Sequence, residues 1–165
     1  ASTRVGSTTI DHAIIRYLRD QHNFYVGGQT AEWIKVNYAQ AKKIGRDSQI
    51  TVRGQDLANG IPKTLTVSTA EIREAVAKPV FDMLKVIQRI LESVPPELSG
   101  DLVDRGMTLT GGGALLKGFD QLITDTTGIK VRIAPNAMTA AVEGSGRMLD
   151  DFKQYMKFFV DSMES

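Results

Sequence analysis

The chain has 165 residues, 42% hydrophobic and 24% charged, which is the composition of an ordinary globular protein with one core or two small subdomains. Its 20 Lys plus Arg against 19 Asp plus Glu give a net charge of +1, so no bulk positive field favours nucleic acid or anionic lipid as a partner. The sequence contains no cysteine, which excludes disulfides, thiolate metal sites and cysteine nucleophiles. With no long apolar run and no signal peptide pattern, we expect a cytosolic chain.

Two helices are predicted near the N-terminus. Apolar residues recur at helical spacing over residues 10–18, after Thr8 and Thr9, which can cap a helix of about three turns. A glycine pair at 27–28 precedes Thr30, which can cap the second helix. We expect that helix to end near Gly45.

A small inserted hairpin and a long helix follow. Residues 50–53 and 61–67 have a β pattern, and the loop GQDLANG between them suits two antiparallel strands. Ser68 and Glu71 form a capping box, after which apolar residues keep a helical period as far as Val94. Pro79 predicts a kink or break in this helix, and the Pro95–Pro96 pair ends it.

The stretch from residue 107 to 133 joins an apolar strand, the glycines Gly111, Gly112 and Gly113, a helix and a second strand. This is about the size of a βαβ unit, which predicts a parallel sheet with helices packed on it. Because glycine lacks a Cβ, a flat ligand can lie directly on such a turn, and a following helix presents free N–H groups. By itself the turn predicts a structural tight turn first and a nucleotide site second.

Two well-known phosphate motifs are absent from this turn. A Walker A loop needs Lys and then Ser or Thr after its last glycine, whereas Phe119 and Asp120 follow Gly118. A dinucleotide fingerprint needs a third glycine where Leu116 stands. The pattern therefore argues against a Rossmann dehydrogenase.

Few other side chains could carry chemistry. Glu32 and Lys35 have i,i+3 spacing, so one helix face presents a carboxylate that can accept and an ammonium that can donate, although a solvated ion pair is the alternative. His12 and His22 have no spaced partner, and we expect satisfied or solvent-facing histidines. Asp101 and Asp104 follow the Pro-Pro stop, where we expect them to cap a turn. These residues support no catalytic assignment.

The order of several segments resembles the MreB family of bacterial actin homologues, the rod shape-determining proteins and their paralogues. The longest match is PPELSGDLVDRGMTLTGGGALLKGFDQLITDTTGIKV, which runs through a helix end, a strand, the glycine turn and the next helix. Shorter matches stand in the family's order: IDHAIIRYLRDQHN, TAEWIK, VRGQDLANGIPKTLTV and STAEI. The resemblance covers residues 5–150 and corresponds to the second half of an MreB.

This resemblance implies an α/β, actin-like ATPase (ribonuclease H-like) fold, of which the chain would be domain II. Residues 1–23 and 68–150 would form subdomain IIA, residues 24–67 the inserted subdomain IIB, and residues 151–165 a C-terminal amphipathic helix. ATP would lie between two domains, with Glu32 and Lys35 contacting ribose and adenine. Gly111, Gly112 and Gly113 would form a backbone floor beside the adenine and neighbouring phosphates.

In this family the phosphate loops and the catalytic carboxylate lie upstream of the matched segment. We therefore expect that Mg²⁺ is held mainly by a missing N-terminal domain, and that the chain does not hydrolyse ATP alone. The family forms cytoplasmic filaments of its own subunits at the inner face of the membrane, where they organise cell-wall elongation and maintain rod shape. These implied partners include no nucleic acid.

Two other functions remain open at this stage. The ATPase domain of a heat-shock chaperone or a sugar kinase shares the fold and a similar glycine turn, and a domain that has lost nucleotide binding could keep only protein contacts. Several departures from the family pattern support the latter: Ser7 and Thr8 stand in place of a Gly-Asp pair, Trp33 replaces a typically polar residue, and residues 136–138 replace Asp-Pro-Leu.

The C-terminal tail predicts an amphipathic helix from Met138 onward, with an apolar stripe of Leu149, Phe152, Met156, Phe159 and Met163. We expect this stripe to pack on a partner protein surface. Membrane binding is the weaker alternative, because the acidic residues of the tail offset its lysines.

Overall fold

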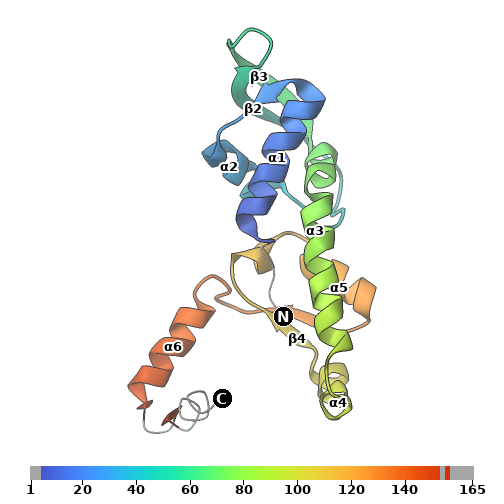
Figure 1. Cartoon of the computed structure of the whole chain (residues 1–165), viewed down its shortest axis with the longest axis vertical. Coiled ribbons are helices and arrows are strands. Elements are labelled where there is room, and N and C mark those ends of the chain that lie inside the picture. The colour runs from blue at the N-terminus through green and yellow to red at the C-terminus, as the bar shows by residue number, and fades with distance from the viewer. Residues whose placement is uncertain (1–4, 153–154, 157–165) are drawn as a thin grey trace.

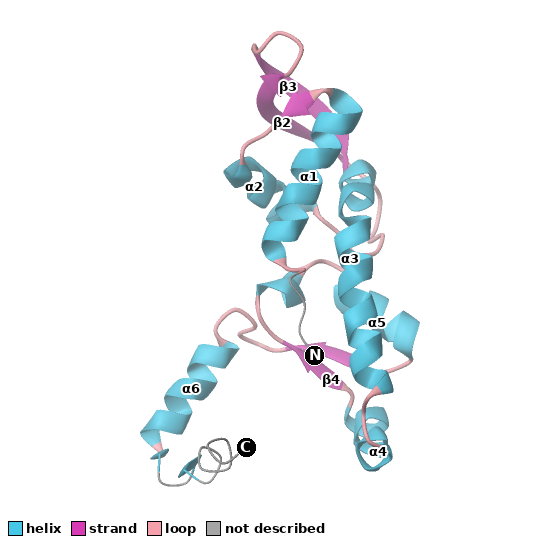
Figure 2. Ribbon diagram, in the orientation of Figure 1, coloured by secondary structure: helices cyan, strands magenta, loops and turns pink. Residues whose placement is uncertain are grey.

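The computed structural model describes residues 5–152 and 155–156 (Figure 1). Its elements are, in chain order, α1 (Ser7–His22), β1 (Phe24–Tyr25), α2 (Gly28–Tyr38), β2 (Gln49–Asp56), β3 (Pro62–Ser68), α3 (Thr69–Glu92), α4 (Pro96–Arg105), β4 (Met107–Leu109), the 3₁₀ turn η1 (Gly112–Leu115), α5 (Phe119–Thr127), β5 (Val131–Ile133) and α6 (Ala140–Asp150). Helices α1 and α3 run side by side, with the β2–β3 hairpin at one end of the molecule and β4, β5 and α4 toward the other (Figure 2).

Helix α1 begins three residues before the predicted periodicity. Gly6 has extended backbone, with φ of −154°, and its carbonyl accepts from the Thr9 N–H at 3.0 Å. The Gly6 N–H in turn donates to Thr9 Oγ1 at 3.3 Å. Thr9 therefore does assist the N-terminus, but from inside the first turn rather than as the capping residue itself.

The predicted end of the second helix near Gly45 is wrong. Helix α2 ends at Tyr38, and the next residue, Ala39, is extended and 1% exposed. Beyond it, the Ala41 N–H donates to the Lys117 carbonyl at 2.8 Å. The chain leaves the helix where a distant segment offers this hydrogen bond in place of a helical one. Helical periodicity in the sequence does not reveal such a distant partner. The helix also begins earlier than predicted, with Gly27 and not Thr30 at its N-cap.

The predicted hairpin is present and larger than expected. Strands β2 and β3 pair antiparallel with Ile50 opposite Val67 and Val52 opposite Leu65. Strand β2 continues through part of the predicted loop to Asp56. Strand β3 pairs with its residues as far as Gln55, and β1, which was not predicted as a strand, pairs with its last two residues. The sheet order is β1-β2-β3.

Helix α3 has the predicted capping box and is continuous through Pro79 to Glu92, so of the predicted kink or break the break is absent. Asp101 and Asp104 do not cap a turn but lie within α4, which begins at Pro96. Pro96 suits the first position of α4, because an N–H at that position would have no hydrogen-bond partner within the helix.

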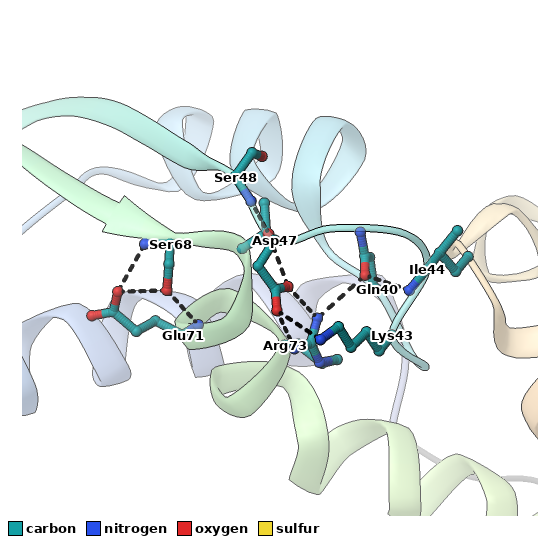
Figure 3. Close-up of polar contacts among 9 residues, drawn as sticks. Gln40, Lys43, Ile44, Asp47, Ser48, Ser68, Glu71 and Arg73 are labelled. Carbon is teal, nitrogen blue, oxygen red and sulfur yellow. Dashed lines mark hydrogen bonds and ion pairs between the residues drawn. The ribbon is translucent and has the colours of Figure 1, made fainter.

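The loop between α2 and β2 is fastened to the first turn of α3. Figure 3 shows Asp47 and Gln40 of the loop converging on Arg73, beside the Ser68–Glu71 cap. Thr69, 4% exposed, joins the same network by accepting from the Ser48 N–H at 3.1 Å. Its buried hydroxyl is therefore hydrogen-bonded, as a buried polar group requires.

Strands β4 and β5 pair in parallel, with Met107 opposite Val131 and Leu109 opposite Ile133, as the predicted βαβ unit requires. The core extends from this unit to the hairpin, and its members include fully buried side chains of α1, α2, α3, α5 and the β1–β3 sheet: Ile14, Leu18, Phe24, Ile34, Val52, Val67, Ile72, Val76 and Ile123.

Helix α6 stands apart from this core (Figure 1). Among its apolar residues Val142 is 74% and Leu149 71% exposed, and the helix contains no buried residue. Phe152 and Met156 of the predicted stripe are also exposed, whereas Phe159 and Met163 lie outside the described residues. Within the described part of the chain, no helix is both long and apolar enough to cross a membrane.

Candidate functional site

A cavity of about 320 Å³ lies where α2 meets the glycine turn that follows β4. Four of the five residues predicted for the nucleotide site line it: Glu32, Lys35, Gly112 and Gly113. The two helix residues and the two glycines are far apart in the sequence, and the fold brings them to one cavity. Gly111 does not line the cavity.

Most of the remaining lining is apolar. It comes from α1, α2, η1 and the segment before α6: Ile10, Val36, Ala39, Leu115, Leu116 and Met138. A mainly apolar pocket with a few convergent polar groups is typical of sites for small organic ligands. A flat, uncharged ring fits this lining better than a phosphate group does, because no basic side chain other than Lys35 contributes to it.

Gly111 has a conformational part in the site. Its φ of +80° is a backbone conformation that L-residues with a side chain rarely adopt. Its N–H donates to the Ala137 carbonyl at 2.6 Å, which ties the turn to the segment carrying Met138. The amide is therefore engaged within the protein and shapes the turn, and the predicted place of Gly111 in the floor of the site stays a prediction.

The neighbouring glycines give the turn its open surface. A Cβ built on Gly112 would lie 3.2 Å from Met138 Sδ, whereas one on Gly113 would meet no atom within 4 Å. Gly113 therefore has open space beside its backbone, where a ligand can approach the main chain.

The charged side of the cavity is an ion-pair network around Lys35. Lys35 Nζ lies 4.0 Å from Glu32 Oε1 and 2.9 Å from Asp11 Oδ1, and donates to Ser7 Oγ at 2.5 Å. The predicted face with one carboxylate and one ammonium is thus present. The sequence analysis missed Asp11, although the i,i+4 spacing of Ser7 and Asp11 on α1 places them on one helix face.

The two histidines are not part of this site. His22 Nε2 lies 2.9 Å from Glu71 Oε1, so His22 has a hydrogen-bond partner, as was expected for a satisfied histidine. His12 lines a different hollow between α1 and α3, together with Tyr17. Burial, and then the hydrogen bond to Glu74, raise the pKa of Tyr17 to about 12, so this phenol stays protonated.

The described residues include no group of three or more His, Asp or Glu side chains placed to hold a metal ion. For the cavity itself, Glu32 is the single carboxylate of the lining. The residues present thus fit the nucleoside part of a nucleotide, whereas the described part of the chain does not offer a cluster of ligands for Mg²⁺.

Comparison with known proteins decides the family. The model of the MreB/Mbl protein family matches residues 1–157. The chain belongs to the MreB/Mbl family. One relative is the cell shape-determining protein Mbl of Bacillus subtilis (strain 168). It is 36% identical over 157 residues, which are 95% of this chain and 47% of Mbl. The cell shape-determining protein MreB of Escherichia coli (strain K12) is 39% identical over 150 residues, 91% of this chain and 43% of that protein.

The chain therefore spans slightly less than half the length of these MreB/Mbl relatives. Among solved structures, MreB5 of Spiroplasma citri bound to ADP superposes with a TM-score of 0.89 at 28% identity, covering 95% of this chain and 48% of MreB5. The fold is thus that of an actin-like protein, as the sequence predicted.

Proposed function

We propose that the chain is the second half of an MreB-like bacterial actin and supplies the adenosine side of its ATP site. The observation that carries this proposal is that Glu32, Lys35, Gly112 and Gly113 line the same cavity in a chain of the MreB/Mbl family. The nucleotide in the MreB5 structure supports it, since that relative was bound to ADP.

The chemistry of the lining assigns a part to each group. The apolar residues pack against the adenine ring, the Glu32 carboxylate accepts from ribose hydroxyls, and the Lys35 ammonium donates to ribose or base. Gly112 and Gly113 let the base approach the main chain. ATP supplies the phosphoanhydride bond whose hydrolysis drives filament turnover, with its phosphates and Mg²⁺ held mainly by the N-terminal domain of the intact protein.

For the intact protein we propose an ATP-dependent cytoskeletal filament, assembled from its own subunits at the cytoplasmic face of the membrane. Its further partners are the N-terminal domain and the cell-wall elongation machinery, and nucleic acid is not among them. The names of the two relatives as cell shape-determining proteins support this assignment. We assign residues 1–23 and 68–150 to subdomain IIA, residues 24–67 to IIB and residues 151–165 to a C-terminal amphipathic helix.

Titration of the ¹⁵N-labelled chain with ADP, followed by NMR, tests the site and measures even millimolar dissociation constants. We expect the largest shifts in α2 and the glycine turn. Glu32→Ala should weaken binding about tenfold, the worth of a hydrogen bond to a charged group. Gly113→Ala should also weaken binding while leaving the fold intact, because its Cβ meets no protein atom but takes space from the ligand.

Lys130→Ala is the matched control, since it removes an exposed charge beside the opposite end of β4. Equal affinities in all these variants, or ADP-induced shifts confined to other surfaces, would contradict the proposed site. The filament proposal has its own test: addition of the N-terminal half of a relative should produce ATP-dependent sedimentation, and unchanged solubility would count against it.

A further inference from the structure

Asp11 forms an ion pair with Lys35, which lines the cavity. The Lys35 ammonium donates to Asp11 Oδ2 at 3.0 Å, and Asp11 Oδ1 lies 2.9 Å from the same nitrogen. The Asp11 side chain is 15% exposed and that of Lys35 11%, so both charges are largely removed from water. Asp11 itself does not line the cavity.

Two hydrogen bonds constrain the Lys35 ammonium. An ammonium has three N–H donors, of which one goes to Ser7 Oγ and one to the Asp11 carboxylate. Among the described residues, Asp11 Oδ1 is buried and has no hydrogen-bond partner, and the charged group that lies beside it is the Lys35 ammonium. Because a buried charge without its partner is costly, this pair fixes the Lys35 side chain, and the third donor remains for the cavity.

The same network sets the charge of this corner. Lys35 and Asp11 neutralise each other, and Glu32, whose side chain is 65% exposed, adds a negative charge 4.0 Å from the ammonium. The three residues together carry a net charge of −1. Such a corner favours an uncharged hydroxyl group as a ligand and repels an anion, despite the presence of a lysine.

We propose that Asp11 is a positioning residue of the nucleotide site, which orients Lys35 and makes the site select a free ribose hydroxyl over a phosphorylated one. This inference rests on the proposed adenosine site and adds a residue and a specificity to it. Asp11 acts through Lys35 and touches no ligand.

The test compares two nucleotides that differ only in the 3′-phosphate, adenosine 5′-monophosphate and adenosine 3′,5′-bisphosphate. The wild-type chain should prefer the monophosphate. In Asp11→Asn, which keeps the side-chain shape, that preference should fall about tenfold because one negative charge is removed. Asp20→Asn is the matched control: it removes an equal charge from an exposed position of α1 and should leave the preference unchanged.

A second measurement does not depend on nucleotide binding. The ammonium ¹⁵N resonance of Lys35 should be visible at low temperature in the wild-type chain, because its protons exchange slowly in the ion pair, and should broaden or disappear in Asp11→Asn but not in Asp20→Asn. If Asp11→Asn does not fold, Asp11→Glu provides the readout, since it keeps the charge but displaces the carboxylate by one methylene group and should broaden the same resonance; an unchanged resonance would contradict the inference.

The outcomes are distinguishable. An unchanged preference together with an unchanged Lys35 resonance in Asp11→Asn would overturn the inference while leaving the adenosine site in place. If the wild-type chain binds neither nucleotide, the proposed site and the selectivity both fail, and the resonance alone decides whether Asp11 holds Lys35. A lost preference with a lost resonance supports both proposals.

Discussion

Arg73 of α3 donates to both carboxylate oxygens of Asp47, with Nη1–Oδ1 at 2.9 Å and Nη2–Oδ2 at 3.3 Å. This two-point contact fastens the connection between α2 and β2 to the N-terminal part of α3 (Figure 3). Gln40 extends it, because its Oε1 accepts from Arg73 Nη1 at 3.3 Å and from the Ile44 N–H at 3.1 Å. The connection is thus held by side chains in place of regular secondary structure.

The Asp47–Arg73 pair predicts an acid-dependent part of the stability. The hydrogen bond from Arg73 lowers the pKa of Asp47 from 3.8 to about 2. A carboxyl group whose folded pKa is depressed stabilises the fold fully above its unfolded pKa and loses this contribution as the pH falls through the folded pKa. We therefore expect the loss to occur from pH 3.8 down to about 2.

Urea unfolding of Asp47→Asn and wild type across this pH range checks the prediction. The variant should be less stable than wild type at neutral pH, and the difference should vanish toward pH 2. The lowered pKa values of Asp56, Glu71 and Glu143 make both proteins less stable in acid, so only the difference between them reports on Asp47. A constant difference at every pH would contradict the assignment.

The N-terminus of α3 predicts an effect that is separate from the Asp47–Arg73 pair. Ser68 Oγ accepts from the Glu71 N–H at 3.2 Å, and Glu71 Oε2 accepts from the Ser68 N–H at 2.7 Å. Ser68→Ala should lower the free energy of unfolding by about 1 kcal/mol, as is usual for the loss of an N-cap hydroxyl. Ser145→Ala removes a hydroxyl that only donates to the Ala141 carbonyl within α6, and should cost less. Equal losses would show that the cap is not responsible.

Features that depend on neighbouring residues were predictable from the sequence. The α3 capping box, the β2–β3 hairpin and the parallel βαβ unit are each fixed by local patterns of turn residues and apolar periodicity. The end of α2 was not predictable, because it depends on hydrogen bonding to Lys117, far along the chain. Helix α4 was missed because its sequence combines a proline start with a glycine and two aspartates, which read locally as a turn.

The candidate site divides in the same way. Glu32 and Lys35 could be paired from their i,i+3 spacing, and the glycines stood out as a turn, while the resemblance to MreB joined the two. Asp11 could not be paired with Lys35 by spacing, since 24 residues separate them. The hydrogen bond from the Gly111 N–H to the Ala137 carbonyl was also not predictable, because the two residues lie far apart in the sequence.

Gly54 of β2 is required by close packing rather than by backbone conformation. A Cβ at this position would lie 2.3 Å from the Tyr25 carbonyl oxygen and 2.6 Å from Phe24 Cε1. Gly54→Ala should therefore force β1 from β2 and lower the free energy of unfolding by about 1–3 kcal/mol, as overpacking does. Chemical denaturation measures the loss, and faster hydrogen exchange of β1 and β2 amides would locate it.

Gly100→Ala is the control for this glycine, because no atom lies within 4 Å of its added Cβ and the residue is inside α4. Alanine is the better helix former, so this variant should gain up to about 1 kcal/mol. If Gly54→Ala were as stable as wild type, the Phe24 ring would have to be displaced at no cost, which the buried position of that ring argues against.

The contact between α1 and α3 gives the last prediction, because it supports the helix that carries Ser7 and Asp11. Ile72 of α3 is 0% exposed in the core that also contains Ile14 of α1. Ile72→Ala should lower the free energy of unfolding by about 2–5 kcal/mol, because the lost transfer free energy of the removed atoms is joined by the cost of the cavity that they leave.

Ile90→Ala makes the same chemical change near the end of α3, where the side chain is 39% exposed, and should cost less than Ile72→Ala. Urea unfolding of the two variants compares them directly. Equal losses in the free energy of unfolding would show that packing at the two ends of α3 contributes similarly to stability. The expected inequality would instead assign the principal support of α1 to the first half of α3, on the side of the molecule where the Asp47–Arg73 contact also lies.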